Sequence, residues 1–245
     1  MRRNTYNYFP QIINLASHGL MALADVRRVR RLLDLGGAVV APSDTGYAIV
    51  SLPFTAAGQR ALGALTVAQQ DMTPLAFGSS GQVRAFLSLG AASERVVDAL
   101  CPGPVTLVTD VPHGPTGAKM ATALGTPGTI GVRIPASAVQ CQLSTELGQA
   151  LTTAALRDDD GRIVRDAETA IGLIRRRAVG MDRPDLVAFV AHCTFAYSEH
   201  STVVELIDRA FAPPIVRTHR EGALDIAVIA RAARTVGASD MEDWT

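Results

Sequence analysis

The chain has 245 residues, of which 48% are hydrophobic and 19% are charged, and its formal net charge is zero. These values predict one large globular domain, or a domain with a small appendage, that buries a substantial core. A neutral chain has no overall electrostatic field that attracts nucleic acid or a membrane surface. No run of eighteen apolar residues occurs, so the sequence offers no candidate membrane span.

Residues 1–20 are predicted to form an irregular arm and residues 236–245 a C-terminal tail, so the expected domain covers residues 21–235. Apolar residues at helical spacing predict a first helix over residues 24–35, which Gly36 and Gly37 end. The arginines between those apolar positions are expected to form a solvated helix face, with phosphate contact as the alternative. Val-rich and Ile-rich strands are predicted over residues 38–41 and 48–52, on either side of a polar turn.

Helices are predicted over residues 56–66, 82–89 and 92–100, and a short strand over residues 73–77. The Pro-Gly-Pro corner at residues 102–104 cannot continue a helix and leads into a strand over residues 105–111. A loop over residues 113–124 precedes a strand over residues 129–134. This strand contains Arg133 among apolar neighbours, which predicts a paired or edge charge that points out of the apolar face of the sheet.

The second half continues with a helix over residues 137–147, a strand over 151–156, a charged loop over 157–165 and a helix over 166–177 capped by Asp166. Further strands are predicted over residues 186–191, 202–206 and 215–220, and a closing helix over 223–234. The three carboxylates at residues 158–160 fit no calcium loop and predict a solvated turn. Strands and helices interleave without strict alternation, which predicts an α/β fold with a mixed sheet, packed helices and an open face for ligands.

The spacing of the reactive residues predicts no metal site and no protein nucleophile. The three cysteines show no zinc spacing, and their odd number fits a reducing, cytoplasmic location. No histidine lies beside a serine or cysteine as a nucleophile–base pair would, so ordinary structural roles are expected for His113, His192, His200 and His219. His219, beside Arg220, is the first of these to test. The two standard nucleotide-binding glycine loops are absent, and Lys119 is the only lysine.

A density of hydroxyl groups distinguishes the first polar turn. Ser43, Thr45 and Tyr47 alternate, so in an extended segment they share one face. A plain hairpin loop and a binding segment are both compatible with this pattern.

Four stretches, in this order, resemble the YrdC/YciO superfamily: PSDTGY at residues 42–47, PGPVTLV at 102–108, GVRIP at 131–135, and STVVE at 201–205 with REG at 220–222. The best-known members make threonylcarbamoyl-AMP from threonine, bicarbonate and ATP, for the threonylcarbamoyladenosine modification of tRNA. The resemblance covers residues 26–223, and the PSDTGY form is nearer to the YciO branch than to the established synthases. It implies a single YrdC-like domain, in which helices pack on a twisted mixed sheet that has an open concave cavity.

The resemblance also implies site residues and ligands. Thr45 and Arg133 would be catalytic, with the planar fork of Arg133 holding a carboxylate or a phosphate. The residues implied for substrate and nucleotide binding are Ser43, Tyr47, Thr106, Thr153, Ser201, Thr202 and Arg220. The implied ligands are ATP with Mg²⁺ as substrate and threonine or another amino acid, and tRNA or double-stranded RNA is a further implied partner.

The sequence departs from the family pattern at two places. Where the synthases carry a phosphate-contacting Lys-x-Arg pair, this chain has Val67 and Gln69, and where they carry Ser-x-Asn it has Ala154 and Leu156. Because adenylyl transfer depends on positioning and charge neutralisation, these changes predict weakened adenylation. Two alternatives therefore stay open, a non-catalytic protein of this fold that binds RNA or a nucleotide, and an enzyme that forms a carbamoyl-adenylate from carbamoyl phosphate.

Overall fold

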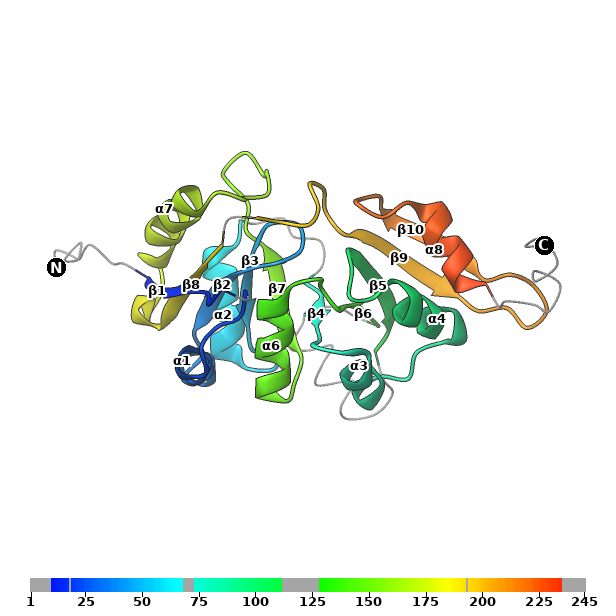
Figure 1. The fold of residues 1–245 in the computed structure, drawn as a ribbon, viewed down its shortest axis with the longest axis horizontal. Helices are drawn as coiled ribbons and strands as arrows, with labels where there is room; N and C mark the ends of the chain where they lie inside the picture. The colour runs from blue at the N-terminus through cyan, green and yellow to red at the C-terminus, as the bar shows by residue number, and fades with distance from the viewer. Residues whose placement is uncertain (1–9, 18, 68–72, 112–127, 193, 235–245) are drawn as a thin grey trace.

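The computed structural model describes residues 10–17, 19–67, 73–111, 128–192 and 194–234. Within these residues one mixed sheet of ten strands has the order β1-β8-β2-β3-β7-β4-β6-β5-β9-β10. Figure 1 shows β1 (Gln11–Asn14) at one end of the molecule and the hairpin of β9 (Thr202–Ile207) and β10 (Ile215–Arg220) at the other. The predicted α/β class and mixed sheet are confirmed.

The other elements lie close to their predicted positions. The remaining strands are β2 (Ala38–Pro42), β3 (Tyr47–Ser51), β4 (Leu75–Ala76), β5 (Val105–Asp110), β6 (Thr129–Arg133), β7 (Leu151–Ala155) and β8 (Val187–Ala191). The helices are α1 (Leu23–Asp34), α2 (Ala56–Leu65), α3 (Ser80–Phe86), α4 (Ala91–Leu100), α6 (Ala138–Leu147), α7 (Ala167–Ala178) and α8 (Ile226–Ala233), with a 3₁₀ turn at Pro184–Leu186. The loop expected over residues 113–124 and the tail over 236–245 lie outside the described residues, as do Gln69, Lys119 and Cys193.

Strand β1 corrects the expectation of an irregular arm over residues 1–20. It pairs in parallel with β8, with Ile13 opposite Val190. Ile13 is 2% exposed while Ile12 is 49% exposed and Gln11 and Asn14 are also exposed, so this edge strand contributes a single side chain to the core. A four-residue strand carries too little periodicity to be recognised without its partner.

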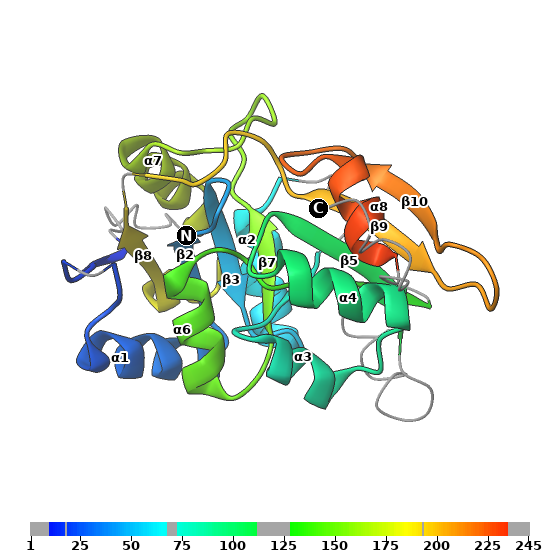
Figure 2. The same ribbon diagram turned by 45° about the vertical axis from the view of Figure 1, so that its right-hand side comes forward.

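Helices cover both faces of the β1-to-β7 half of the sheet. Along β2, Val39 and Ala41 belong to the core beneath α1 and α6, whereas Ala38 and Val40 belong to the core beneath α2 and α7. Figures 1 and 2 show these two helix pairs on either side of the strands. Burial on both faces is why these strands read as continuous apolar runs rather than as alternating ones.

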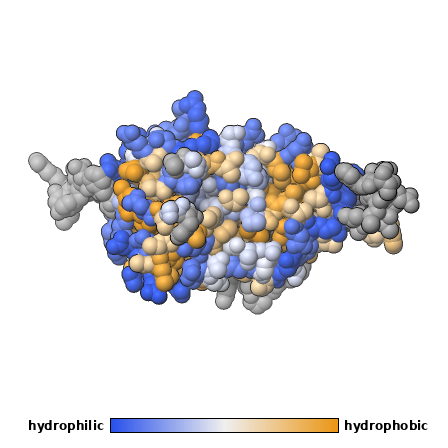
Figure 3. All heavy atoms as spheres, in the orientation of Figure 1, coloured by the Kyte–Doolittle hydropathy of each residue, from blue (hydrophilic) through white to orange (hydrophobic). Residues whose placement is uncertain are grey.

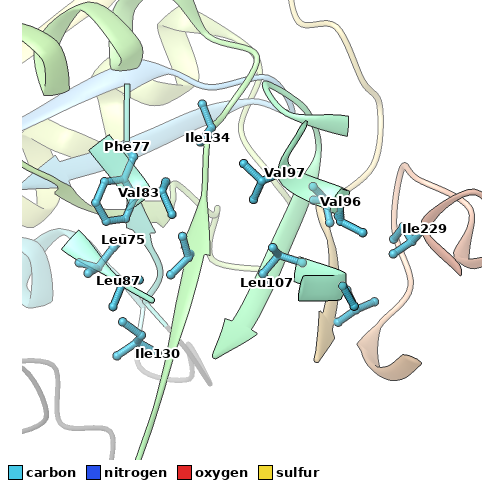
Figure 4. Close-up of a cluster of buried hydrophobic side chains, with 14 of the residues drawn as sticks. Leu75, Phe77, Val83, Leu87, Val96, Val97, Leu107, Ile130, Ile134 and Ile229 are labelled. Carbon is cyan, nitrogen blue, oxygen red and sulfur yellow. The ribbon is translucent and has the colours of Figure 1, made fainter. Parts of the chain in front are cut away.

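The β4-to-β9 half of the sheet buries one face and uses the other for polar groups. Leu107, Val132 and Val204 pack beneath α3, α4 and α8, in the cluster drawn in Figure 4. Their chain neighbours Thr106 and Arg133 point the opposite way, because successive side chains of a strand alternate between its faces. This alternation places polar groups of several strands on one surface.

The loop after β7 is the solvated turn that its carboxylates predicted. Asp158 Oδ1 accepts hydrogen bonds from the main-chain N–H groups of Asp160 and Arg162. In the described part of the chain, no group of three His, Cys, Asp or Glu residues is placed to hold a metal ion. The Asp166 cap is also confirmed, since its carboxylate accepts from Thr169 N at 2.6 Å.

The outer surface is mixed in polarity. In Figure 3 hydrophilic residues surround separate apolar regions rather than one continuous apolar belt. None of the helices that the structure describes is both long enough and apolar enough to span a bilayer.

Replacing Leu107 with Ala should lower the free energy of unfolding by about 2–5 kcal/mol, because the side chain is 2% exposed and its removal leaves a cavity. Urea denaturation measures the change. Ile215→Ala, in a side chain that is 45% exposed, is the control and should alter stability by less than about 1 kcal/mol. Equal losses in the two variants would contradict the placement of this core.

Candidate functional site

A cavity of about 500 Å³ brings together residues from each of the four stretches that carry the resemblance and from other segments of the chain. Its volume lies within the usual range for small-molecule sites. Of the residues implied for the site, it is lined by Ser43, Thr45, Tyr47, Thr106, Arg133, Thr153, Ser201 and Arg220. It is also lined by residues that no sequence pattern indicated as ligands, among them Arg157 and His200, and by His219.

A buried ion pair forms the base of this cavity. Arg133 Nη2 donates to Asp44 Oδ1 at 2.5 Å, and the two side chains are 8% and 0% exposed. Asp44 also accepts from Ser43 Oγ at 3.0 Å and from Ala136 N at 3.2 Å. The paired charge predicted at Arg133 is therefore confirmed. Its partner Asp44 was missed, although a buried arginine requires a carboxylate and the turn motif contains one.

A second hydrogen-bonded group also lines the cavity. The hydroxyl oxygens of Thr106 and Ser201 lie 3.1 Å apart, and Arg220 Nη2 donates to Ser201 Oγ at 3.1 Å. The register between β9 and β10 shifts between Thr218 and Arg220, so that both His219 and Arg220 reach the cavity. These contacts fix the direction of the Ser201 hydroxyl.

Gly222 allows the chain to pass close behind this wall. A Cβ atom at this position would lie 2.2 Å from the carbonyl oxygen of His200. Only glycine permits so close an approach, which is a physical reason for the glycine in the REG stretch.

Thr202 lies on the other face of β9 and does not line the cavity. Its hydroxyl donates to Leu224 O at 2.6 Å and accepts from Leu224 N at 3.0 Å, and the residue is fully buried. Of the two neighbouring residues implied to bind substrate, the structure therefore places Ser201 at the cavity and Thr202 away from it, because neighbouring residues of a strand face opposite ways. Thr202 instead anchors the segment that leads into α8.

Tyr47 contributes a ring rather than a hydroxyl to the cavity. Its hydroxyl donates to His192 O at 2.5 Å and accepts from His192 N at 3.0 Å. The ring packs against Phe189 and Phe195 at centroid distances of 5.0 and 5.3 Å. These contacts hold the ring in place as part of the wall.

Arg157 and His200 form a contact that joins the loop after β7 to the segment before β9. Arg157 Nη1 lies 3.3 Å from His200 Nε2. Because a guanidinium only donates, this nitrogen of His200 accepts and the ring proton lies on Nδ1. Burial and the nearby charges of Arg157, Arg220 and Arg165 lower the pKa of His200 to about 4, so the imidazole is neutral at pH 7.

The described cysteines are structural. Burial raises the pKa of Cys101 to about 11, and neither Cys101 nor Cys141 lines the cavity. A thiol with so high a pKa is a poor nucleophile. The arrangement is therefore suited to binding and positioning anionic groups, not to cysteine-based covalent catalysis.

Comparison with known families and structures agrees with this geometry. The Sua5/YciO/YrdC family model, described as "Telomere recombination", matches residues 31–219. Comparison with curated protein sequences finds no match.

Solved structures share the fold at low sequence identity. A P. abyssi Sua5 carrying two substitutions matches with a TM-score of 0.71 and 18% identity over 91% of this chain and 60% of that chain. P. abyssi Sua5 complexed with L-threonine has a TM-score of 0.68 and 17% identity over 92% and 61%. E. coli YciO has a TM-score of 0.66 and 19% identity over 89% and 98%. The chain thus spans about three fifths of the Sua5 chains.

Asp44→Asn should lower the free energy of unfolding by about 3–5 kcal/mol, because it leaves the buried Arg133 charge without its partner. Urea denaturation measures the loss. Adding Arg133→Gln to Asp44→Asn should recover part of it, since the double variant contains no unpaired buried charge. Strictly additive losses would show that the two side chains are not coupled.

The depressed pKa of His200 predicts a loss of stability in acid. Below about pH 6.5 the unfolded chain takes up a proton that folded His200 does not accept until about pH 4, so the free energy of unfolding should fall across this interval. NMR titration of the imidazole in the folded protein measures the pKa directly. In His200→Gln the fall in stability between pH 7 and pH 5 should be smaller. A folded-state pKa near 6.5 would contradict the prediction.

Proposed function

The chain belongs to the Sua5/YciO/YrdC family, and from this premise we propose that it is a threonylcarbamoyl-AMP synthase-like protein whose cavity takes L-threonine or a similar amino acid together with ATP. The observation that carries the proposal is the meeting of hydroxyl and guanidinium groups from four distant segments around one cavity. The L-threonine complex of P. abyssi Sua5, which shares the fold, supports the choice of amino acid.

The charge of the cavity supports an anionic ligand. The chain as a whole is neutral, yet Arg157 and Arg220 line the cavity beside the paired Arg133, and none of the described lining residues is Asp or Glu. Guanidinium groups match the planar geometry of carboxylates and phosphates and are the preferred residues for recognising both. An amino acid with a nucleotide supplies both of these groups.

The proposed reaction has two steps. The amino group of threonine attacks bicarbonate, water leaves, and a carbamate forms. A carbamate oxygen then attacks the α-phosphorus of ATP, and pyrophosphate leaves with the electron pair of the broken P–O bond. The chain holds the reactants in place, with Arg133 on a carboxylate or a phosphate and Thr45 beside it. Mg²⁺ would enter on the ATP phosphates as part of the substrate.

Binding without adenylation is the second candidate. Ala154 lines the cavity where the family pattern has serine, and Leu156 lies fully buried in the core beneath α2 and α7. A cavity that keeps the arginines but lacks these polar groups suits a protein that retains a nucleotide or RNA without turning over ATP. Carbamoyl-adenylate formation from carbamoyl phosphate is a third outcome that the same assay distinguishes.

Pyrophosphate release should require ATP, bicarbonate and L-threonine together. In Ser201→Ala it should fall by about tenfold or more, because removing a hydroxyl that contacts the charged Arg220 costs about 1.5–3 kcal/mol. A coupled phosphate assay measures the rate, and calorimetry measures ATP binding. Thr218→Ala, in an exposed residue of β10 away from the cavity, is the control and should match the wild type.

Other outcomes would replace the proposal. Salt-sensitive binding of RNA without any pyrophosphate release would select the binding protein. Pyrophosphate release that depends on carbamoyl phosphate would select the third reaction. An absence of ATP binding would remove both adenylating candidates.

A further inference from the structure

The cavity contains a cation, Arg157, that the sequence motifs did not indicate. The pattern has a phosphate-contacting Lys-x-Arg pair before β4, and in this chain Val67 occupies the first of those places. Arg157, two residues beyond the end of β7, lines the cavity instead.

Sheet geometry places Arg157 near the segment that leads directly into β4. Strands β4 and β7 are antiparallel, with Leu75 opposite Thr152. In an antiparallel pair the start of one strand lies beside the end of the other. The hydrogen bond from Thr153 N to Pro74 O extends this contact toward the segment before β4. Pro74 and Arg157 both line the cavity, so a cation after β7 lies at the part of the cavity that the start of β4 also reaches.

We propose that Arg157, oriented by His200 and flanked by Arg220, forms a phosphate subsite that holds the polyphosphate chain of the nucleotide. This inference rests on the proposed function for the identity of the ligand, a nucleoside triphosphate. It assigns to Arg157 the neutralising role of the absent Lys-x-Arg pair.

The Arg157 side chain is held in place by its neighbours. Nη1 donates to Gly161 O at 2.6 Å and lies 3.3 Å from His200 Nε2. Arg177 Nη2 donates to Arg157 O at 2.8 Å, which fixes the main chain beneath the side chain. Because one terminal nitrogen makes both contacts, the fork is oriented before a ligand arrives, and less conformational entropy is lost on binding.

The charge of the Arg157 fork is not paired with a carboxylate among the described residues. Arg157 and Arg165 form no ion pair with any residue that the structure describes. The loop carboxylates are engaged elsewhere, Asp159 by Arg176 and Arg177 and Asp160 by Arg162. A partly buried cluster of like charges is stabilised by an anion and repels cations, so a polyphosphate fits it and a metal ion does not.

His200 is suited to orient Arg157 because it is neutral. The groups whose charges act on it are Arg157, Arg165 and Arg220, and His219 lines the same cavity. All three arginines disfavour the imidazolium, so the ring stays an acceptor for the guanidinium. An anion bound among the arginines would offset their charge and make protonation of His200 easier.

The test uses inorganic pyrophosphate as the probe, and calorimetry on the full chain measures its affinity. Arg157→Gln should weaken binding by about 10–100-fold, the range expected for losing a hydrogen bond to a charged group. Arg157→Lys should retain part of the affinity, because it keeps the charge but loses the fork. The matched control is Arg162→Gln, in the same loop but 76% exposed and outside the cavity, which should change affinity by less than about twofold.

NMR of His200 gives a second readout that does not depend on a variant folding. Saturating pyrophosphate should raise the pKa of His200 in the wild-type protein, since the anion offsets the nearby guanidinium charges. The inference is overturned if pyrophosphate does not bind, if it binds without moving this pKa, or if Arg157→Gln and Arg162→Gln weaken binding equally.

The two proposals fail separately. Pyrophosphate binding that depends on Arg157, without threonine-dependent release of pyrophosphate from ATP, would overturn the proposed synthase reaction and leave the subsite standing. Threonine-dependent release that is unchanged in Arg157→Gln would keep the reaction and remove the subsite.

Discussion

The buried pair between Asp44 and Arg133 is the interaction on which the site depends. It joins the turn between β2 and β3 to the end of β6, and Asp44 also accepts through its main-chain oxygen from Tyr197 N at 3.0 Å. Taking two charges out of water is costly, so such a pair adds little net stability unless its remaining hydrogen-bonding atoms are satisfied. Ser43 and Ala136 satisfy the carboxylate. The pair therefore fixes the relative position of segments that carry cavity residues.

Strand alternation explains how one sheet provides both a core and a site. On β5 and β6 the residues that face α3, α4 and α8 are aliphatic, and their neighbours carry a hydroxyl or a guanidinium. The same rule removes Thr202 from the site that its neighbour Ser201 lines. A shift in register at β10 is what brings two successive residues, His219 and Arg220, to the cavity.

The sequence predicted those features of the fold that depend on residues close together in the chain. Apolar periodicity located the helices and strands, a capping side chain located the start of α7, and an arginine in an apolar strand indicated a charge partner. Contacts between distant segments were not predictable in this way. Strand β1 exists because β8 pairs with it, and Arg157 meets His200 across 43 residues of sequence. Neither residue of that contact has a neighbour in sequence that indicates its partner.

A neutral chain can still place positive charge at a cavity, because the local arrangement of charges matters as well as their sum. Carboxylates pair with arginines in the loop after β7, whereas Arg157 and Arg165 remain without a carboxylate partner among the described residues. Such local imbalance favours anions. It also allows binding and catalysis to be considered separately. Arginines suit an anionic group by charge and shape, whereas adenylyl transfer additionally requires polar groups aligned on the α-phosphate, and Ala154 at the cavity carries none. The proposed binding of a nucleotide and its proposed turnover therefore depend on different residues and are tested separately.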